Sequence, residues 1–354
     1  MAQLSESVAP LCPVNRHEAV STAPPQIKEV QMSGLPSADE VIGYMKTLSN
    51  WGRWGPEDTK GTLNLISSAN RRCAGALVTD GESISLSKKI PHLGIAEAWG
   101  ETGPRSYMIQ SGERYAWDPV TESQFQMAVE SLSMIFHGEL FTHIDDMSHV
   151  FYRGKMYNGR PSSLVTSADG AKEQNVDAMR DGVFTRGILF DFARFRGADF
   201  VAAGDPVLPE HLDAMEEMQG VRVMEGDAVL LRTGYQGALD RAENTGATRP
   251  KGHSGWSVAC LPWFRDRGVS LIGADVFNEA NPTGYDVSID PGLFLSPVHV
   301  VALVAMGLPL LDNTHLEHLA EVCAAKNRWE FCFVVNPLRL DRGTGSPVNP
   351  IAVF

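Results

Sequence analysis

Several features are missing from this sequence, and each absence removes a class of function. The five cysteines are scattered without a CxxC pair, which is typical of reduced thiols in an intracellular protein rather than of a disulfide framework. The formal net charge is −13 and no run of six basic residues offsets it, which argues against a nucleic-acid partner. The N-terminus lacks a basic region followed by an apolar one, and the longest apolar run, 298–311, contains a His and a Pro and is too short to span a bilayer. We therefore expect a cytoplasmic protein with no membrane partner.

Three motifs of common enzyme classes are also absent. No GxGxxG follows a predicted strand, which disfavours a Rossmann dinucleotide site. No Gly-x-Ser-x-Gly elbow occurs, and no cysteine lies in a recognisable nucleophile context. A hydrolase that works through a covalent Ser or Cys intermediate is therefore a poor candidate.

The organisation of the chain is read from its prolines and its apolar periodicity. The 354 residues, 43% of them hydrophobic, are enough for a sizeable core. Residues 1–37 contain five prolines and few large apolar residues, so we predict an irregular N-terminal arm there and a single domain over 38–354. A Ser37–Glu40 capping box predicts a helix start at the boundary.

The predicted elements alternate in type, which indicates an α/β fold with mixed sheets and flanking helices. Period-two alternation and short apolar runs predict strands at 83–87, 126–132, 187–191, 227–233, 269–275 and 331–335. Helical patterns cover 209–219, 259–267, 299–306 and 313–326.

The chemistry-bearing residues are concentrated in residues 137–149, which contain three histidines and three acids. If this segment is extended, Glu139, Phe141, His143 and Asp145 project to one face. Nitrogen and oxygen donors gathered in this way suit Zn²⁺ or Mn²⁺. The alternative is a solvated polar loop, but the apolar residues at 134–136 and 140–141 favour burial, where such groups need a partner.

The spacing of this segment resembles a known signature. Thr142-His143-x-Asp145-x-x-x-His149 is similar to His-x-Gly-Thr-His-x-Asp-x-Pro-x-His of the cyclase family, which includes bacterial kynurenine formamidase and isatin hydrolase. The resemblance extends over most of the chain, through blocks at 53–58, 61–64, 156–159, 226–230, 267–275, 297–299 and 307–313.

The resemblance implies a swivelling β/β/α fold, a homodimer or larger homo-oligomer, and a centre of one or two divalent metal ions, Mn or Zn. By position, His143 and Asp145 resemble the ligands of the signature, and His299 and Asp312 resemble a second ligand pair. His149 resembles the catalytic histidine that shuttles a proton. The residues alone leave alternatives open: a surface role for His149, a core or cap role for His299, and an N-cap role for Asp312.

The chain departs from the signature at several positions. Glu139 stands at the first His, where its carboxylate can still be a metal ligand and would favour Mn²⁺; His137 is the alternative ligand. Phe141 and Met147 replace the Gly and the Pro, and we expect both to shape the substrate pocket. Asp312 replaces a more usual Glu and has a shorter reach.

Three further residues are placed less directly. Trp54 and Asn64 are expected at the border of the substrate pocket, with a packed Gly-rich turn as the alternative. Asp146 is expected to be exposed, with a role as hydrogen-bond acceptor for a ligand imidazole as the alternative.

The leading functional hypothesis is a metal-dependent hydrolase that acts on the C–N or related bond of a small amide, formamide, lactam or lactone, with a metal-activated water. The first alternative is a metal-dependent lyase that catalyses cyclisation or dehydration. The second is a non-catalytic small-molecule-binding protein with a degenerate site, because the first His of the signature is missing.

Overall fold

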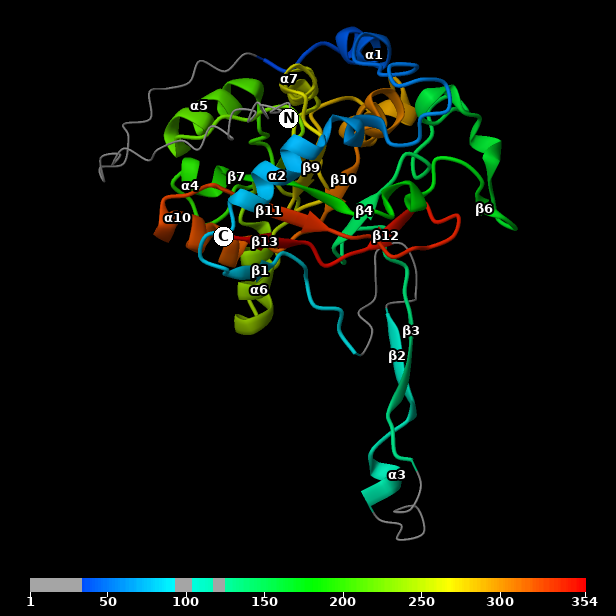
Figure 1. Ribbon diagram of the computed structural model, residues 1–354. Helices are drawn as coiled ribbons and strands as arrows, with labels where there is room; N and C mark the ends of the chain where they lie inside the picture. Colours follow the sequence, from blue (N-terminus) through cyan, green and yellow to red (C-terminus); the bar gives the residue numbers. More distant parts are fainter. Residues whose placement is uncertain (1–33, 93–103, 117–124) are drawn as a thin grey trace, which may run out of the picture.

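The computed structural model describes residues 34–92, 104–116 and 125–354 (Figure 1). All but the last four residues of the predicted N-terminal arm, 1–37, therefore lie outside the described part of the chain. Within the described part, no helix is both long enough and apolar enough to cross a membrane.

A nine-stranded mixed sheet forms the centre of the molecule. Its four middle neighbours, β7, β8, β9 and β10, run parallel, and the strands on either side of them pair antiparallel. In spatial order the strands are β1 (Ser83–Ser85), β13 (Ile351–Val353), β11 (Glu330–Val335), β7 (Val183–Asp191), β8 (Ala228–Arg232), β9 (Leu271–Ala274), β10 (Leu310–Asp312), β4 (His143–Asp145) and β12 (Gly345–Pro347).

The core lies on both faces of the parallel strands. Residues 188–190 of β7 and 228–231 of β8 are fully buried, as expected for parallel strands with both faces covered. Helices α2 and α5 pack against β7.

The helices are short and lie around the sheet. The longest are α1 (Ala38–Thr47), α2 (Ser68–Ala76), α5 (Pro209–Gln219), α6 (Tyr235–Thr245), α7 (Leu261–Arg267) and α10 (Glu317–Lys326). The single-turn helices are α3 (Glu113–Ala116), α4 (Phe192–Phe195), α8 (Pro291–Phe294) and α9 (Pro297–His299). A π-helical segment, Val300–Met306, follows α9 directly.

The sequence predictions can be compared with these elements. The α/β class is confirmed, the six predicted strands are present, and the Ser37–Glu40 capping box opens α1 as expected. The helix predicted at 313–326 begins only at Glu317. Asp312 is the last residue of strand β10, and the residue before the helix is Leu316. The alternative that Asp312 caps this helix is therefore wrong.

A two-stranded hairpin, β2 (Arg105–Gln110) and β3 (Val129–Ser133), lies outside the central sheet. We refer to its described residues, 104–116 and 125–136, as the β2–β3 hairpin. It extends away from the sheet and helices as a separate ribbon (Figure 1). A second short pair, β5 (Val165–Thr166) and β6 (Gly170–Ala171), forms a small ribbon of its own.

Candidate metal centre

Strand β4 supplies two of the candidate ligands. It lies between β10 and β12, and its alternation directs His143 and Asp145 to one face and Ile144 to the apolar core on the other. All three side chains are fully buried.

Strand β10 brings Asp312 to the same point. Asp312 is the antiparallel partner of His143, so the two side chains lie on one face of the sheet. Their Nε2 and Oδ2 atoms are 3.5 Å apart. Because the strands pair directly at this position, the short Asp side chain reaches the site that a longer Glu would otherwise be needed to reach.

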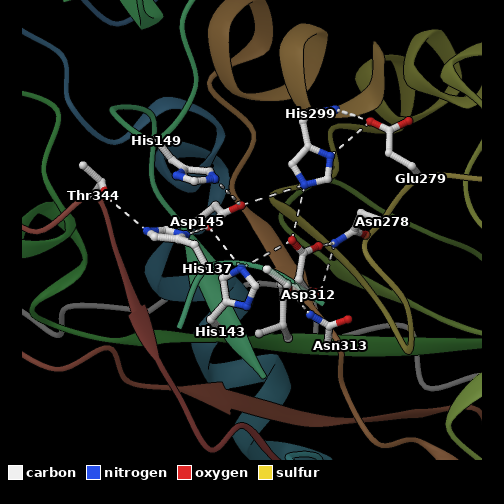
Figure 2. A network of polar contacts seen from close by, with 12 residues as sticks. His137, His143, Asp145, His149, Asn278, Glu279, His299, Asp312, Asn313 and Thr344 are labelled. Carbon is white, nitrogen blue, oxygen red and sulfur yellow. Dashed lines mark hydrogen bonds and ion pairs between the residues drawn. The ribbon is translucent and has the colours of Figure 1, made fainter. Parts of the chain in front are cut away.

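Two histidines, His137 and His149, lie beside Asp145 (Figure 2). His137 Nδ1 lies 2.8 Å from Asp145 Oδ1, and His149 Nε2 lies 3.7 Å from Asp145 Oδ2. The two imidazole rings stack, with centroids 3.8 Å apart and planes inclined by 5°. His137 Nε2 also contacts Thr344 Oγ1 at 3.0 Å, which fixes the ring.

His299 reaches the same centre from the end of α9. Its Nδ1 and its backbone N–H both contact Glu279 Oε1, at 3.0 and 2.9 Å. This contact turns Nε2 toward the acids, 3.3 Å from Asp312 Oδ2 and 3.9 Å from Asp145 Oδ2 (Figure 2). A carboxylate that orients a histidine through its remote nitrogen is a common arrangement around bound metals.

Several buried polar atoms at this centre have no hydrogen-bond partner. They include His143 Nε2 and Asp145 Oδ2, the carboxylate oxygen that His137 does not contact. His143 Nδ1 lies 2.8 Å from the carbonyl of Phe141; the N–H that donates there is on Nδ1, so Nε2 keeps its lone pair. A buried polar atom without a partner costs about 1–3 kcal/mol. A cation between these atoms would remove that cost.

The ligand atoms fall into two groups that share Asp145. One contains His143, Asp145 and Asp312, the other His137, Asp145 and His149, and within each group the atoms lie within 4.8 Å of one another. Imidazole nitrogens and carboxylate oxygens in this combination fit Zn²⁺ or Mn²⁺. The residues present are therefore suited to hold a divalent ion.

The electrostatics of the cluster point the same way. Burial alone would raise the pKa of Asp145, but His149 and His143 outweigh it and hold that pKa well below its usual range. Burial would lower the pKa of His299, yet the Asp312 and Glu279 carboxylates raise it to about 10. Asp145 therefore stays ionised, and the ionised carboxylate is the form that binds a metal ion.

A further set of side chains holds the acids and the loop in place. Asn278 Nδ2 donates to Asp312 Oδ1 and, at 3.0 Å, to the carbonyl of Leu311, while its Oδ1 accepts from Trp256 Nε1 at 3.1 Å. Asn313 Nδ2 donates to the carbonyl of Gly138 at 2.7 Å, which anchors the loop that carries His137. Both asparagines appear in Figure 2.

A cavity of about 680 Å³ opens onto the cluster. His137, His149 and His299 form part of its wall, together with Glu279 and Phe277. The ring of Phe277 stacks on that of His299 at 4.0 Å. The histidines therefore lie between the buried acids and a space large enough for a small molecule.

The predicted first ligand, Glu139, lies outside both groups. It is exposed and lines the cavity, whereas His137, the alternative from the sequence, contacts Asp145. Asp146 was expected to be exposed, and this is wrong: it is fully buried, its Oδ1 accepts from Met147 N–H at 2.8 Å, and burial raises its pKa to about 8.

None of the four predicted substrate-binding residues lines the cavity. Phe141 and Met147 are buried, and Trp54 stacks under the Arg53 guanidinium at 4.6 Å. Asn64 Nδ2 donates to Asp58 Oδ1 at 2.7 Å, in the Gly-rich turn. Their contact with substrate stays a prediction.

Glu279 and Asn278 were not singled out from the sequence. They follow the predicted strand at 269–275, whose observed core is β9, at its carboxyl end. In sheets of parallel strands this end commonly carries the functional residues, and that position was the available signal.

The comparisons with known proteins agree with this geometry. A family model described as "Putative cyclase" matches residues 83–279, more than half of the 354 residues and including His143, Asp145, His149 and Glu279. The crystal structure of a novel cyclase matches with a TM-score of 0.75 and 27% identity, covering 87% of this chain and 100% of that one. A search of curated proteins gave no match.

Isatin hydrolases share the fold. Isatin hydrolase A from Labrenzia aggregata, bound to benzyl benzoate, matches with a TM-score of 0.50 and 19% identity, over 81% of this chain and 98% of that one. The enzyme from Ralstonia solanacearum gives 0.50 and 17%, over 77% and 92%. At these identities the likeness concerns the fold alone.

Proposed function

The chain belongs to the cyclase family, and from that premise we propose that it is a metal-dependent hydrolase of a small amide, formamide, lactam or lactone. One observation carries the proposal. His143 Nε2 and Asp145 Oδ2 are buried without hydrogen-bond partners, beside a cavity of about 680 Å³.

His143, Asp145 and Asp312 would hold the ion, with His299 beside them, and His137 would replace the missing first histidine of the signature in preference to Glu139. The 2.8 Å approach of His137 to Asp145 supports this choice. A divalent ion, Mn or Zn, would supply Lewis acidity that lowers the pKa of a water and polarises the scissile carbonyl.

His149 is the proposed proton carrier. Burial lowers its pKa to about 4, against the attraction of Asp145, so the imidazole is neutral near pH 7 and free to accept a proton. Its side chain is 25% exposed and lines the cavity, so it can reach the substrate. His149 would take the proton of the attacking water and return it to the leaving nitrogen or oxygen.

The metal content of the purified protein is the first test. We expect about one or two equivalents of Mn or Zn, lost in His143→Ala and kept in His318→Ala, a control whose side chain is 65% exposed outside the cluster. Loss in His137→Ala but not in Glu139→Ala would support the ligand choice above. A native protein that stays metal-free after incubation with Mn²⁺ and Zn²⁺ would contradict the proposal and favour a non-catalytic binding protein.

The reaction type needs a second experiment. The metal-loaded protein is incubated with a panel of small amides, formamides, lactams and lactones in ¹⁸O-labelled water. Hydrolysis places one labelled oxygen in the acid product, whereas a lyase that eliminates water does not. An unlabelled dehydrated or cyclised product would replace the hydrolase assignment by the lyase alternative.

A further inference from the structure

A second cavity, of about 640 Å³, lies between the segment after β1 and helix α6, and residues other than the candidate metal ligands line it. Its apolar wall consists of five side chains: Ile90, Pro91, Leu140, Phe141 and Leu239. Phe141, which the sequence placed at the substrate pocket, therefore lines this cavity and not the one beside the metal cluster. A mostly apolar cavity of this size with a few polar groups is typical of a small-molecule site.

Three cations share the wall of this second cavity. Lys88 is half-buried, and Lys89 and Arg249 are exposed. Within the described part of the chain none of the three forms an ion pair, and Asp240 Oδ2, on the same wall, contacts His315 Nε2 at 2.8 Å instead. The wall thus has three cations against two acids, in a chain whose net charge is −13. We refer to this space as the cation-lined cavity.

The position of Lys88 is fixed by the strand that supplies the metal ligands. Its backbone N–H donates to Thr142 Oγ1 at 2.9 Å, and Thr142 directly precedes His143 of β4. The pKa of Lys88 is lowered to about 8, first by burial and also by the charge of Arg249, although Asp240 attracts the ammonium group. Two cations that repel each other across a cavity are stabilised when an anion binds between them.

A narrow cavity of about 120 Å³ lies between the cation-lined cavity and the cavity beside the metal cluster. It shares Leu239 and Arg249 with the first, and His253 and Phe277 with the second. The cation-lined cavity is therefore a neighbour of the space in which a substrate would meet the metal.

We propose that the cation-lined cavity binds a small carboxylate that has an apolar body. The proposal rests on the proposed function for the source of this ligand, because hydrolysis of an amide, lactam or lactone releases a carboxylic acid, which is ionised at pH 7. Lys88 and Arg249 hold the carboxylate through charge-assisted hydrogen bonds, and the apolar wall covers the body. The cavity thereby distinguishes the acid product from the neutral amide or lactone that precedes it.

The test uses one isoleucine methyl group in each cavity. Ile90 lines the cation-lined cavity, and Ile135 lines the cavity beside the metal cluster. The full chain is labelled with ¹³C at the isoleucine δ1 methyls, and the two NMR signals are identified by their loss in Ile90→Val and Ile135→Val. Benzoate is the carboxylate probe, and benzyl alcohol is its neutral counterpart. We expect benzoate to shift the Ile90 signal along a saturable curve, and benzyl alcohol to bind about 10-fold more weakly or worse.

Variants of the two cations separate recognition of the charge from apolar binding. Lys88→Met and Arg249→Gln should each raise the dissociation constant of benzoate by about 10-fold or more. Arg249 is exposed, so its variant keeps the test decisive even if Lys88→Met fails to fold. Lys46→Met, at an exposed lysine in the last turn of α1, is the control and should leave the dissociation constant unchanged.

Several results would overturn the proposal. They are a benzoate shift at Ile135 alone, no shift of either signal, equal binding of benzoate and benzyl alcohol, and unchanged binding in Arg249→Gln. The readout needs neither metal nor activity, so a failure of the proposed hydrolase would be seen separately, in the metal content and in the ¹⁸O experiment.

Discussion

The metal-site cluster and the β2–β3 hairpin depart from the usual distribution of side chains in opposite directions. The cluster places acids and histidines in the interior, where Asp145 and Asp312 are fully buried, and the hairpin places Ile109 and Phe125 at 60% and 84% exposure. Buried polar groups and exposed apolar groups both cost free energy in an isolated chain. We propose that an ion satisfies the buried groups of the cluster, whereas the hairpin leaves its apolar side chains exposed within the described residues.

Removal of the shared acid should have the largest effect. We expect Asp145→Asn to weaken metal binding by about 1,000-fold or more and to abolish hydrolysis, because Asp145 belongs to both ligand groups. Metal affinity is measured by competition with a chelator. Asp240→Asn, an acid 53% exposed beside His315, is the control. Undiminished affinity in Asp145→Asn would remove the metal explanation for the buried cluster.

Truncation of one apolar side chain in each region should show how differently the two regions contribute to the free energy of unfolding. Ile144→Ala removes a fully buried side chain on β4 and should lower the free energy of unfolding by about 2–5 kcal/mol. Leu132→Ala, at a position 54% exposed, should change it by no more than about 0.5 kcal/mol. Urea unfolding of the two variants and the native protein measures both effects. Equal losses would mean that the hairpin belongs to the core.

The contact that orients His299 should contribute less to metal affinity than the ligands themselves. Glu279→Gln leaves the size of the side chain unchanged but removes the charge that His299 Nδ1 contacts at 3.0 Å. We expect metal affinity to fall by about 10–100-fold, as is common when such a partner is changed. Glu243→Gln, on the exposed side of α6, serves as the control. If both variants bind metal like the native protein, Glu279 has no orienting role.

The half-buried Lys88, outside the metal cluster, tests whether burying a charge without a metal lowers the stability of this protein. Burial lowers the pKa of Lys88 to about 8, although Asp240 attracts its charge. Because the folded pKa lies below the unfolded value, the unfolded chain binds more protons between about pH 8 and 10.5, and stability rises with pH across that window.

Lys88→Met should remove this dependence. At pH 7, where Lys88 is charged in both states, the variant should be more stable by on the order of 1–2 kcal/mol, after allowance for partial exposure. The free energy of unfolding is measured at several pH values from 7 to 10.5. A destabilised variant, or one that keeps the rise, would show that the amine has a stabilising partner.

Much of the fold could be predicted from the sequence because its signals are local. The helix at 209–219 is confirmed to the residue, with Pro209 at its start and Gly220, at φ 64°, at its end. The three-residue strands β10 and β12 were not predicted, because so short a segment has no periodicity of its own and is defined by its partners.

The sequence by itself determined the chemistry of the centre. His143, Asp145 and His149 lie within seven residues, so one strand and the turn after it keep them close together independently of how the rest of the chain folds. Only the tertiary structure decided the other members. His299 and Asp312 reach the cluster because α9 and β10 place them beside β4, and His137 lies against Asp145 where the spacing of the signature indicated Glu139. Spacing along the chain limits which residues can meet, but the packing of the sheet determines which of them do, because the free energy of burying these groups depends on the partners that distant segments provide.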